Sequence, residues 1–331
     1  MLQVNNQTPF AAEITTFPNE QGIDSLYVIV KATFLMGQQW RLADEQIPPQ
    51  MGDEYWGEPG ESSIKALSDF HIGKVATDIL MQGNACALNQ QSVSQLDVSL
   101  SVGKVQKTVR VFGDRHWQNG VPSRPVPFQE MPLVYERSFG GQYQVEGKDT
   151  IIAEQRNLVG CGFVGKRTNR EVEGLPVPNL EDPLHLINST SDNPQPVGFS
   201  PTCGYWFPRN QWAGTYDDNW QTSRAPYLPE DFDKRFLNAA HPDLIYPGYL
   251  QGGEAISITG MHPDGSINLQ VPYVKINCHV QLKSKLIPIN LNIETLTIEP
   301  NIQQLSLVWS APFECDKNLL NISEVVLKLA R

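Results

Sequence analysis

The chain has 331 residues, with 25 Gly, 25 Pro and a formal net charge of −11 at pH 7. No basic run offsets this charge locally, so we expect no nucleic-acid partner, because such binding requires clustered Lys and Arg at the phosphates. No stretch approaches the roughly 18 consecutive apolar residues of a spanning helix, and the first residues lack the layout of a signal peptide. We therefore expect a cytoplasmic protein without a membrane partner.

Strand patterns dominate the first third of the chain. Residues 26–35 are β-branched and aromatic with a period of two, which predicts a strand. A second extended region is expected over residues 74–87. The clearest alternation covers residues 95–102, and together with residues 105–112 it predicts an antiparallel hairpin.

The periodicity disappears from His116 to about Tyr249, where Pro, Gly, Asn and aromatic residues dominate. A structureless loop of this length is unusual inside a compact domain, so we expect packing to order it and short strands to occur in it. One helix is expected at Glu230–Ala240, with acidic residues at its start and Pro242 just beyond its end.

Strand patterns return after Gly252. They predict strands over residues 255–259, 267–271, 274–282, 289–298 and 305–309, whereas the last segment, SEVVLKLAR, fits either a strand or a short helix. The sequence thus predicts a mainly β fold with one or two antiparallel β-sandwich units, a long ordered irregular middle region and few short helices.

The domain division that we expect is soft. A boundary within residues 113–127 separates an N-terminal β-rich region, 1–120, from a loop-rich middle plus a C-terminal β-sandwich region, 121–331. The other arrangement left open by the sequence is one continuous unit.

Residues that carry chemistry are scattered along the chain. Five cysteines without a C-x-x-C pair indicate ordinary thiols rather than a disulfide framework or a zinc site. There is no G-x-S-x-G motif to indicate a nucleophile. Four loop carboxylates offer oxygen ligands, but their spacing matches no calcium loop and roles as hydrogen-bond acceptors are favoured: Asp217, Asp218, Asp231 and Asp233. We expect no catalytic residue, no metal and no cofactor.

The tripeptide His-Pro-Asp occurs twice, at residues 241–243 and 262–264. Pro and Asp both have conformational reasons to occur in turns. The second copy therefore predicts a hairpin turn, and the first is interpreted as the stop signal of the expected helix.

The middle region is rich in aromatic rings and arginines. Such side chains combine a large area with directional polar contacts, and they anchor protein interfaces. The alternative is that they form a core beneath a long loop. As a partner-binding surface we expect Tyr135, Arg137, Trp206, Arg209, Trp212, Tyr216, Trp220 and Arg224.

Longer motifs make the sequence recognisable. They are LVYERSFGG (133–141), NLVGCGFVG (157–165), LPVPNLE (175–181), VGFSP (197–201), WAGTYDDNW (212–220) and RAPYLPEDFDKRFLNAAHPD (224–243). These segments resemble a bacterial family first catalogued as a domain of unknown function, whose members are encoded beside type VI secretion genes. The resemblance extends over nearly the whole chain. It implies a non-enzymatic cytosolic adaptor or chaperone that loads toxic effectors carrying a PAAR tip domain onto the VgrG spike.

Two functions from different classes follow. The resemblance implies a protein-binding adaptor whose partners are a PAAR-domain effector and the VgrG spike protein. The alternative is a hydrolase that acts on carbohydrate or peptide through the middle-loop aspartates, with tryptophans as sugar platforms. A stable body, a broad aromatic surface and a solubilising net charge favour the adaptor.

Overall fold

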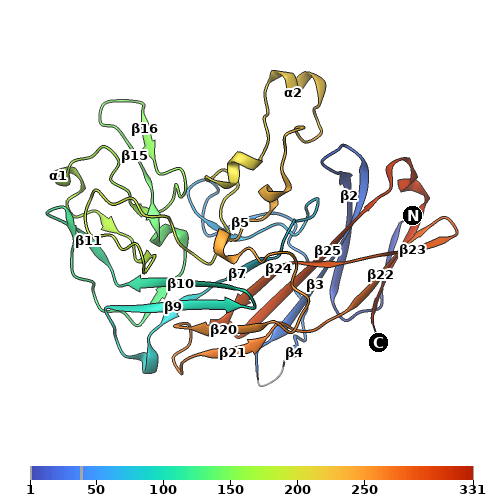
Figure 1. Ribbon diagram of the computed structural model, residues 1–331, viewed down its shortest axis with the longest axis horizontal. Helices are drawn as coiled ribbons and strands as arrows, with labels where there is room; N and C mark the ends of the chain where they lie inside the picture. The colour runs from blue at the N-terminus through green and yellow to red at the C-terminus, as the bar shows by residue number, and fades with distance from the viewer. Residues whose placement is uncertain (1, 38–39, 331) are drawn as a thin grey trace.

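The computed structural model describes residues 2–37 and 40–330, and it is mainly β (Figure 1). Both ends of the chain contribute strands to one sandwich, beside which lies a further sheet with the irregular middle region above it. The fold class predicted from the sequence is therefore confirmed.

The first sheet of the sandwich is built around the strand predicted at residues 26–35, which is β3. Nearly every residue of β3 is buried, because sheet partners and packed layers cover both of its faces. Neighbouring strands pair antiparallel except β24 and β7, which are parallel. In sheet order the strands are β2 (Ala11–Pro18), β3 (Asp24–Leu35), β25 (Gln304–Glu314), β24 (Asn292–Glu299) and β7 (Asp78–Met81), with β4 (Arg41–Leu42) also on β3.

The second sheet of the sandwich shares its apolar core with the first. Its strands in order are β1 (Gln3–Asn6), β26 (Ile322–Leu329), β22 (Ile276–Leu282) and β23 (Lys285–Ile289). Val280 and Val325 join the same buried cluster as Leu307 of the first sheet. The ring of Phe10 stacks on Trp309 with centroids 6.1 Å apart. The final segment, ambiguous in sequence, is therefore a strand.

The predicted hairpin is confirmed as β9 and β10. It belongs to a five-stranded sheet with the order β19 (Leu180–Glu181), β10 (Val105–Phe112), β9 (Gln95–Val102), β20 (Ala255–Thr259) and β21 (Ile267–Gln270). Val98, Leu100 and Val102 join the main core. On the opposite face, Ser99 Oγ and Thr108 Oγ1 lie 2.8 Å apart across the hairpin. The alternation of apolar and polar residues thus matches the two faces.

The middle region is ordered through short elements, as expected. Its strands and those of the preceding segment are β5 (Glu54–Tyr55), β6 (Ile64–Ala66), β8 (Asn84–Cys86), β11 (Arg115–Gln118), β12 (Val121–Pro122), β13 (Glu130–Pro132), β14 (Phe139–Gly140), β15 (Gln142–Gln144), β16 (Ile151–Ala153), β17 (Cys161–Gly162) and β18 (Pro176–Val177). The helices are α1 (Asn169–Val172), α2 (Asp218–Ser223) and the 3-10 turns η1 (Leu88–Gln90), η2 (Tyr135–Arg137), η3 (Arg209–Trp212), η4 (Lys234–Leu237), η5 (Pro242–Leu244), η6 (Pro300–Ile302) and η7 (Asp316–Asn321).

The helix expected at Glu230–Ala240 is wrong. Only η4 forms there, and the side chain of Asp233 accepts a hydrogen bond from the backbone of Arg235 at its start. The backbone N–H of Ala239, which a continuing helix would use internally, instead donates to Asp78 Oδ2 at 2.9 Å. A tertiary contact thus overrides the local propensity.

The proposed division near residue 120 stays a prediction. What the structure shows is that β3, which precedes this position, pairs with β25, and that β9, which also precedes it, pairs with β20. Strands on both sides of the soft boundary therefore share two sheets.

A buried polar cluster joins residues 71–78 to β24. Lys74 Nζ lies 2.8 Å from both Asp78 Oδ2 and Thr295 Oγ1, and the backbone N–H of Lys74 donates to Glu294 Oε1 at 3.0 Å. His71 Nε2 lies 3.6 Å from Glu294 Oε2, and this oxygen has no hydrogen-bond partner among the described residues. A buried carboxylate with an unsatisfied oxygen is costly in its charged form.

The cluster makes stability depend on pH. Burial raises the pKa of Glu294 from 4.5 to about 7, although the charge of Lys74 opposes this. As the pH rises between these values, the unfolded state loses the proton first, so the contribution of Glu294 to the free energy of unfolding falls. Burial, and then the charge of Lys74, lower the pKa of His71 to about 3, so the contribution of His71 is instead lost as the pH falls below 6.5.

Glu294→Gln should reduce the part of this pH dependence that comes from Glu294. We expect the variant to gain on the order of 3 kcal/mol relative to the natural protein between about pH 4.5 and about pH 8, since each pKa unit corresponds to about 1.4 kcal/mol. Urea denaturation of both proteins at a series of pH values measures the difference, in which the His71 contribution largely cancels. A constant difference across that range would show that Glu294 is ionised in the folded protein.

Candidate partner-binding site

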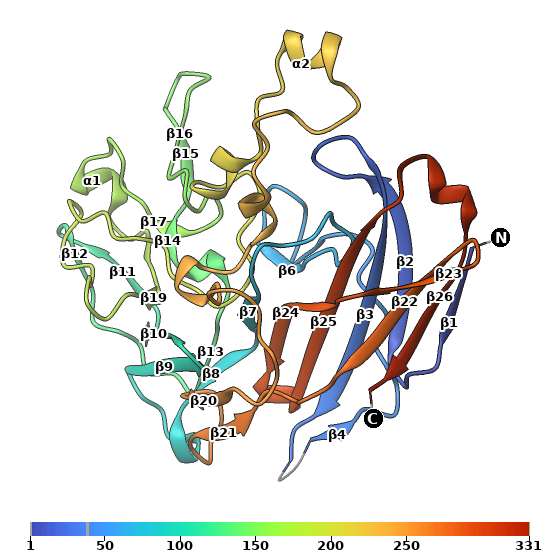
Figure 2. The ribbon, with the colours of Figure 1, turned by 45° about the vertical axis from the view of Figure 1, so that its right-hand side comes forward.

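A projection stands out from the body of the molecule, with α2 at its tip (Figures 1 and 2). We call residues 204–237 the arm. It lies inside the stretch from Gly198 to Asp243, where three tryptophans occur among Gly, Pro, Asp and Arg residues. The arm thus presents the most aromatic part of the sequence away from the main core.

The tip of the arm is held by its own side chains. Asp217 accepts a hydrogen bond from the backbone of Trp220 at 2.8 Å and so caps α2. Trp220 Nε1 donates to the carbonyl oxygen of Tyr227 at 2.8 Å. The rings of Tyr216 and Trp220 pack edge to face with centroids 4.7 Å apart. Trp220 is therefore an internal brace, and Tyr216 covers it from outside.

The aspartates of the arm close its turns. Asp231 accepts hydrogen bonds from the backbone and hydroxyl of Thr215, at 2.9 and 2.7 Å, and these bonds lower the pKa of Asp231. Asp233 pairs with Arg235, whose hydrogen bonds lower the pKa of Asp233. Asp218 lies in the first turn of α2, where a carboxylate is favourable. The hydrogen-bonding roles predicted for these carboxylates are confirmed for Asp217, Asp231 and Asp233.

A second set of contacts fixes the middle of the arm to the turn between β2 and β3. Arg224 donates to the carbonyl oxygens of Leu228 and Glu20, at 2.9 and 2.8 Å. Lys234 Nζ lies 3.0 Å from Glu20 Oε1. Below these contacts, the guanidinium of Arg235 lies over the ring of Trp212, 5.1 Å from its centroid. Arg224 and Trp212, expected on a partner-binding surface, are thus used to hold the arm.

Two of the expected surface residues lie in the core at the root of the arm. Trp206 and Tyr135 are fully buried and form one cluster with Ile64 and Cys203. Their rings pack edge to face at 5.3 Å. Trp206 and Tyr135 therefore do not lie on the surface that was expected from the sequence. Composition alone could not separate them from the exposed rings, because their burial depends on Ile64, which is distant in sequence.

The remaining two arginines are also bound within the protein. Arg209 donates to the carbonyl oxygens of Phe236 and Thr202, at 2.7 and 2.6 Å, and burial lowers its pKa. Arg137 donates to Asn179 at 2.9 Å and to Asp114 at 3.2 Å. Arg209 thus binds the backbone of the middle region, and Arg137 binds two neighbouring side chains.

Four large aromatic side chains of the arm remain exposed. Their exposed fractions are 39% for Tyr205, 48% for Phe207, 54% for Tyr216 and 41% for Tyr227. Of the eight residues expected on a partner-binding surface, only Tyr216 belongs to this group, and Tyr205, Phe207 and Tyr227 were not among them. In the segment Tyr205-Trp206-Phe207, the two flanking rings are exposed and Trp206 is buried. We call these four side chains the exposed ring set.

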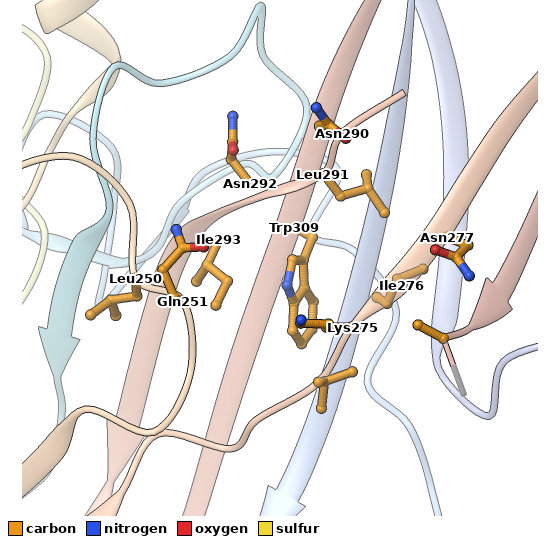
Figure 3. Close-up of a pocket in the computed structure, with 12 residues that line it drawn as sticks. Leu250, Gln251, Lys275, Ile276, Asn277, Asn290, Leu291, Asn292, Ile293 and Trp309 are labelled. Atoms are coloured by element: carbon orange, nitrogen blue, oxygen red, sulfur yellow. The ribbon is translucent and has the colours of Figure 1, made fainter. Parts of the chain in front are cut away.

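Cavities occur outside the arm as well. Figure 3 shows one of about 390 Å³ in the sandwich, with Trp309 at its centre and Leu291, Ile276 and Ile293 around it. Asn290, Asn277 and Gln251, which also line it, are exposed, and Asn292 is half-exposed. This cavity is the open end of the sandwich core, and no element of the arm contributes to it.

The described part of the chain, residues 2–37 and 40–330, contains no group of three or more His, Cys, Asp or Glu side chains that could hold a metal ion. In the same ranges, no helix has the length and apolar character required to cross a membrane.

Comparison with known proteins gives one match. The model of a bacterial family, described as an uncharacterized protein conserved in bacteria (DUF2169), matches residues 21–310. No curated protein and no solved structure matches the chain. The matched range contains the whole arm, together with β3 and the buried cluster around Glu294.

The difference between core and arm tryptophans can be measured. Trp206→Ala should lower the free energy of unfolding by about 3–5 kcal/mol, because it empties a closed aromatic cluster. Trp220→Ala should lower it by about 1 kcal/mol or less, because its contacts lie within the projecting arm. Chemical denaturation of both variants tests this. Equal losses would mean that the arm unfolds together with the core and contributes equally to it.

Proposed function

The chain belongs to the bacterial DUF2169 family, and from this premise we propose that it is a type VI secretion adaptor. In this role it binds a PAAR-associated toxic effector in the cytoplasm and assists its loading onto the VgrG spike. The resemblance of the sequence motifs supplies the secretion context. The observation that supports protein binding is the exposed ring set on the projecting arm.

Four exposed aromatic rings within one projecting segment favour a docking role. Large aromatic side chains lose little conformational freedom on binding and bring a large apolar area, which is why they dominate interface energies. The ring set lies on a segment fixed by Trp220, Arg224 and Lys234 before any partner arrives. Preformed surfaces lose less entropy when they bind, so the same contacts give a tighter complex.

The surroundings of the rings suit a complex that must later dissociate. Asp217 and Asp218 directly follow Tyr216 and are exposed, so the apolar contact at this ring would have a polar rim. Non-obligate interfaces have this composition, whereas permanent ones are more uniformly apolar. The net charge of −11 also keeps the free adaptor soluble.

The same geometry gives less support to a hydrolase. A glycoside hydrolase needs one carboxyl with a raised pKa to act as a general acid. In the arm, Asp231 and Asp233 have lowered pKa values because of the hydrogen bonds from Thr215 and Arg235. Such carboxylates are fixed acceptors, so the adaptor is the function that we put forward.

Co-expression with a PAAR-bearing effector tests the adaptor. We expect the full-length chain to co-purify with it, and the double variant Phe207→Ala/Tyr216→Ala to bind at least about tenfold more weakly, since two interface rings together contribute well over 1.4 kcal/mol. Titration of purified effector by calorimetry gives the affinity.

The matched control is Tyr273→Ala, which removes an exposed ring outside the arm. It should bind the effector like the natural protein, and all variants should keep the same thermal unfolding temperature. Full binding by the arm variant would place the interface elsewhere, and the absence of any complex with the natural protein would contradict the adaptor role.

A further inference from the structure

A cavity of about 310 Å³ opens at the root of the arm, where the first His-Pro-Asp tripeptide meets the five-stranded sheet. Lys107 of β10 and Asp182, which follows β19, line it together with His241 and Asp243. Phe207 also lines it, so one member of the exposed ring set forms part of the cavity wall. Its volume is in the range of pockets that hold small ligands or side chains.

The charges of this cavity are arranged with acids outside and cations inside. The side chain of Lys107 is 6% exposed, whereas those of Asp182 and Asp243 are 30% and 58% exposed. Lys107 Nζ donates to Asp243 Oδ2 at 2.9 Å. The other cation of the wall, Arg156, binds both carboxylate oxygens of Glu154, at 2.6 and 2.7 Å. The carboxylates of Asp182 and Asp243 are therefore more accessible to solvent than the cations of Lys107 and Arg156.

His241 adds no positive charge near neutral pH. Burial, and then the charge of Lys107, lower the pKa of His241 to about 4. Its Nε2 lies 3.3 Å from Lys107 Nζ. The lining itself holds two carboxylates, Asp182 and Asp243, and two cations, Lys107 and Arg156. Glu154, which binds Arg156, adds a third carboxylate, so these five side chains together carry one more negative than positive charge.

Tyr135 supplies a polar atom that lacks a partner. Its side chain lines the cavity and is 2% exposed, and its hydroxyl makes no hydrogen bond with any described residue. Burial raises the pKa of this hydroxyl, and the carboxylate of Asp243 adds to the effect. An unsatisfied buried hydroxyl is costly. A ligand with several N–H donors would satisfy it.

We propose that this cavity receives an arginine side chain of the partner protein, an inference that rests on the adaptor function proposed above. A guanidinium carries five N–H donors in one plane and binds carboxylates through two of them at once. It also packs on aromatic rings, as Arg209 does here over Phe236 at 4.9 Å from the centroid. The exposed carboxylates and Phe207 match these two properties, and the arginine anchors the partner beside the exposed ring set.

The first experiment uses small probes and no partner protein. N-acetyl-arginine amide, N-acetyl-lysine amide, N-acetyl-glutamine amide and N-acetyl-glutamate amide are titrated into the isotope-labelled full-length chain, and the ring signals of His241 and Tyr135 are followed by NMR. We expect arginine amide to shift these signals in a saturable way, lysine amide to bind several-fold more weakly, and the other two to have no effect. Tighter binding of glutamate amide would overturn the proposal in favour of an anion site.

Two variants then locate the binding. Asp182→Asn/Asp243→Asn should weaken arginine amide by about tenfold or more, because both charged acceptors are lost. Tyr135→Phe removes only the unpartnered hydroxyl, so it should keep the thermal unfolding temperature and still weaken the probe by a few-fold. The control, Asp264→Asn, changes the aspartate of the second His-Pro-Asp tripeptide, which is not part of this cavity. It should bind like the natural protein.

The outcomes separate this inference from the proposed function. Unchanged affinity for arginine amide in both the Asp182→Asn/Asp243→Asn and Tyr135→Phe variants would overturn the arginine site, even if the carboxylate variant were less stable. If the exposed ring set binds an effector but the natural chain ignores arginine amide, only the present inference fails. If arginine amide binds but no effector does, the adaptor role fails and a cation site remains.

Discussion

The carboxylate of Asp78 joins two separate parts of the chain, residues 74–78 and 238–239, at one point of the core. It is fully buried, and it accepts hydrogen bonds from Lys74 Nζ, Asn238 Nδ2 and the backbone of Ala239, at 2.8, 3.0 and 2.9 Å. Losing one of these donors would leave a buried charge poorly compensated, which is far more costly than losing a surface ion pair. Asp78 therefore fixes where the chain returns from the arm, and with it the position of the arm on the sandwich.

This constraint explains which elements could be predicted from the sequence. The strand β3 and the hairpin of β9 and β10 carry their own signal, because their apolar periods match the faces that they bury. The expected helix at Glu230–Ala240 had a good local pattern. It does not form because Asn238 and the backbone of Ala239 donate hydrogen bonds to Asp78, about 160 residues earlier in the chain. Local propensity cannot report such a contact, because the competing acceptor is invisible until the sheets are assembled.

The site was predictable as a segment and not as a set of residues. Aromatic rings and arginines in the middle region indicated an ordered loop with a surface, and the arm is such a segment. Within it, Trp206 is core, Trp212 and Trp220 are braces, and Tyr216 is exposed. These roles differ because of what each ring packs against, which is set by tertiary structure, whereas composition treats the rings alike.

The net charge of this molecule and its individual hydrogen-bonding contacts act over different distances. At physiological salt the net charge of −11 acts over about one Debye length, roughly 8 Å, so it attracts basic partners without selecting a site on the surface. Selection requires contacts at hydrogen-bond distance. The cavity at the root of the arm offers them in the outward carboxylates of Asp182 and Asp243, while Lys107 is buried and already paired with Asp243. The net charge that attracts a partner and the carboxylates that select it are thus both negative at the place where the arm meets the body. A partner with an arginine beside an apolar segment satisfies both.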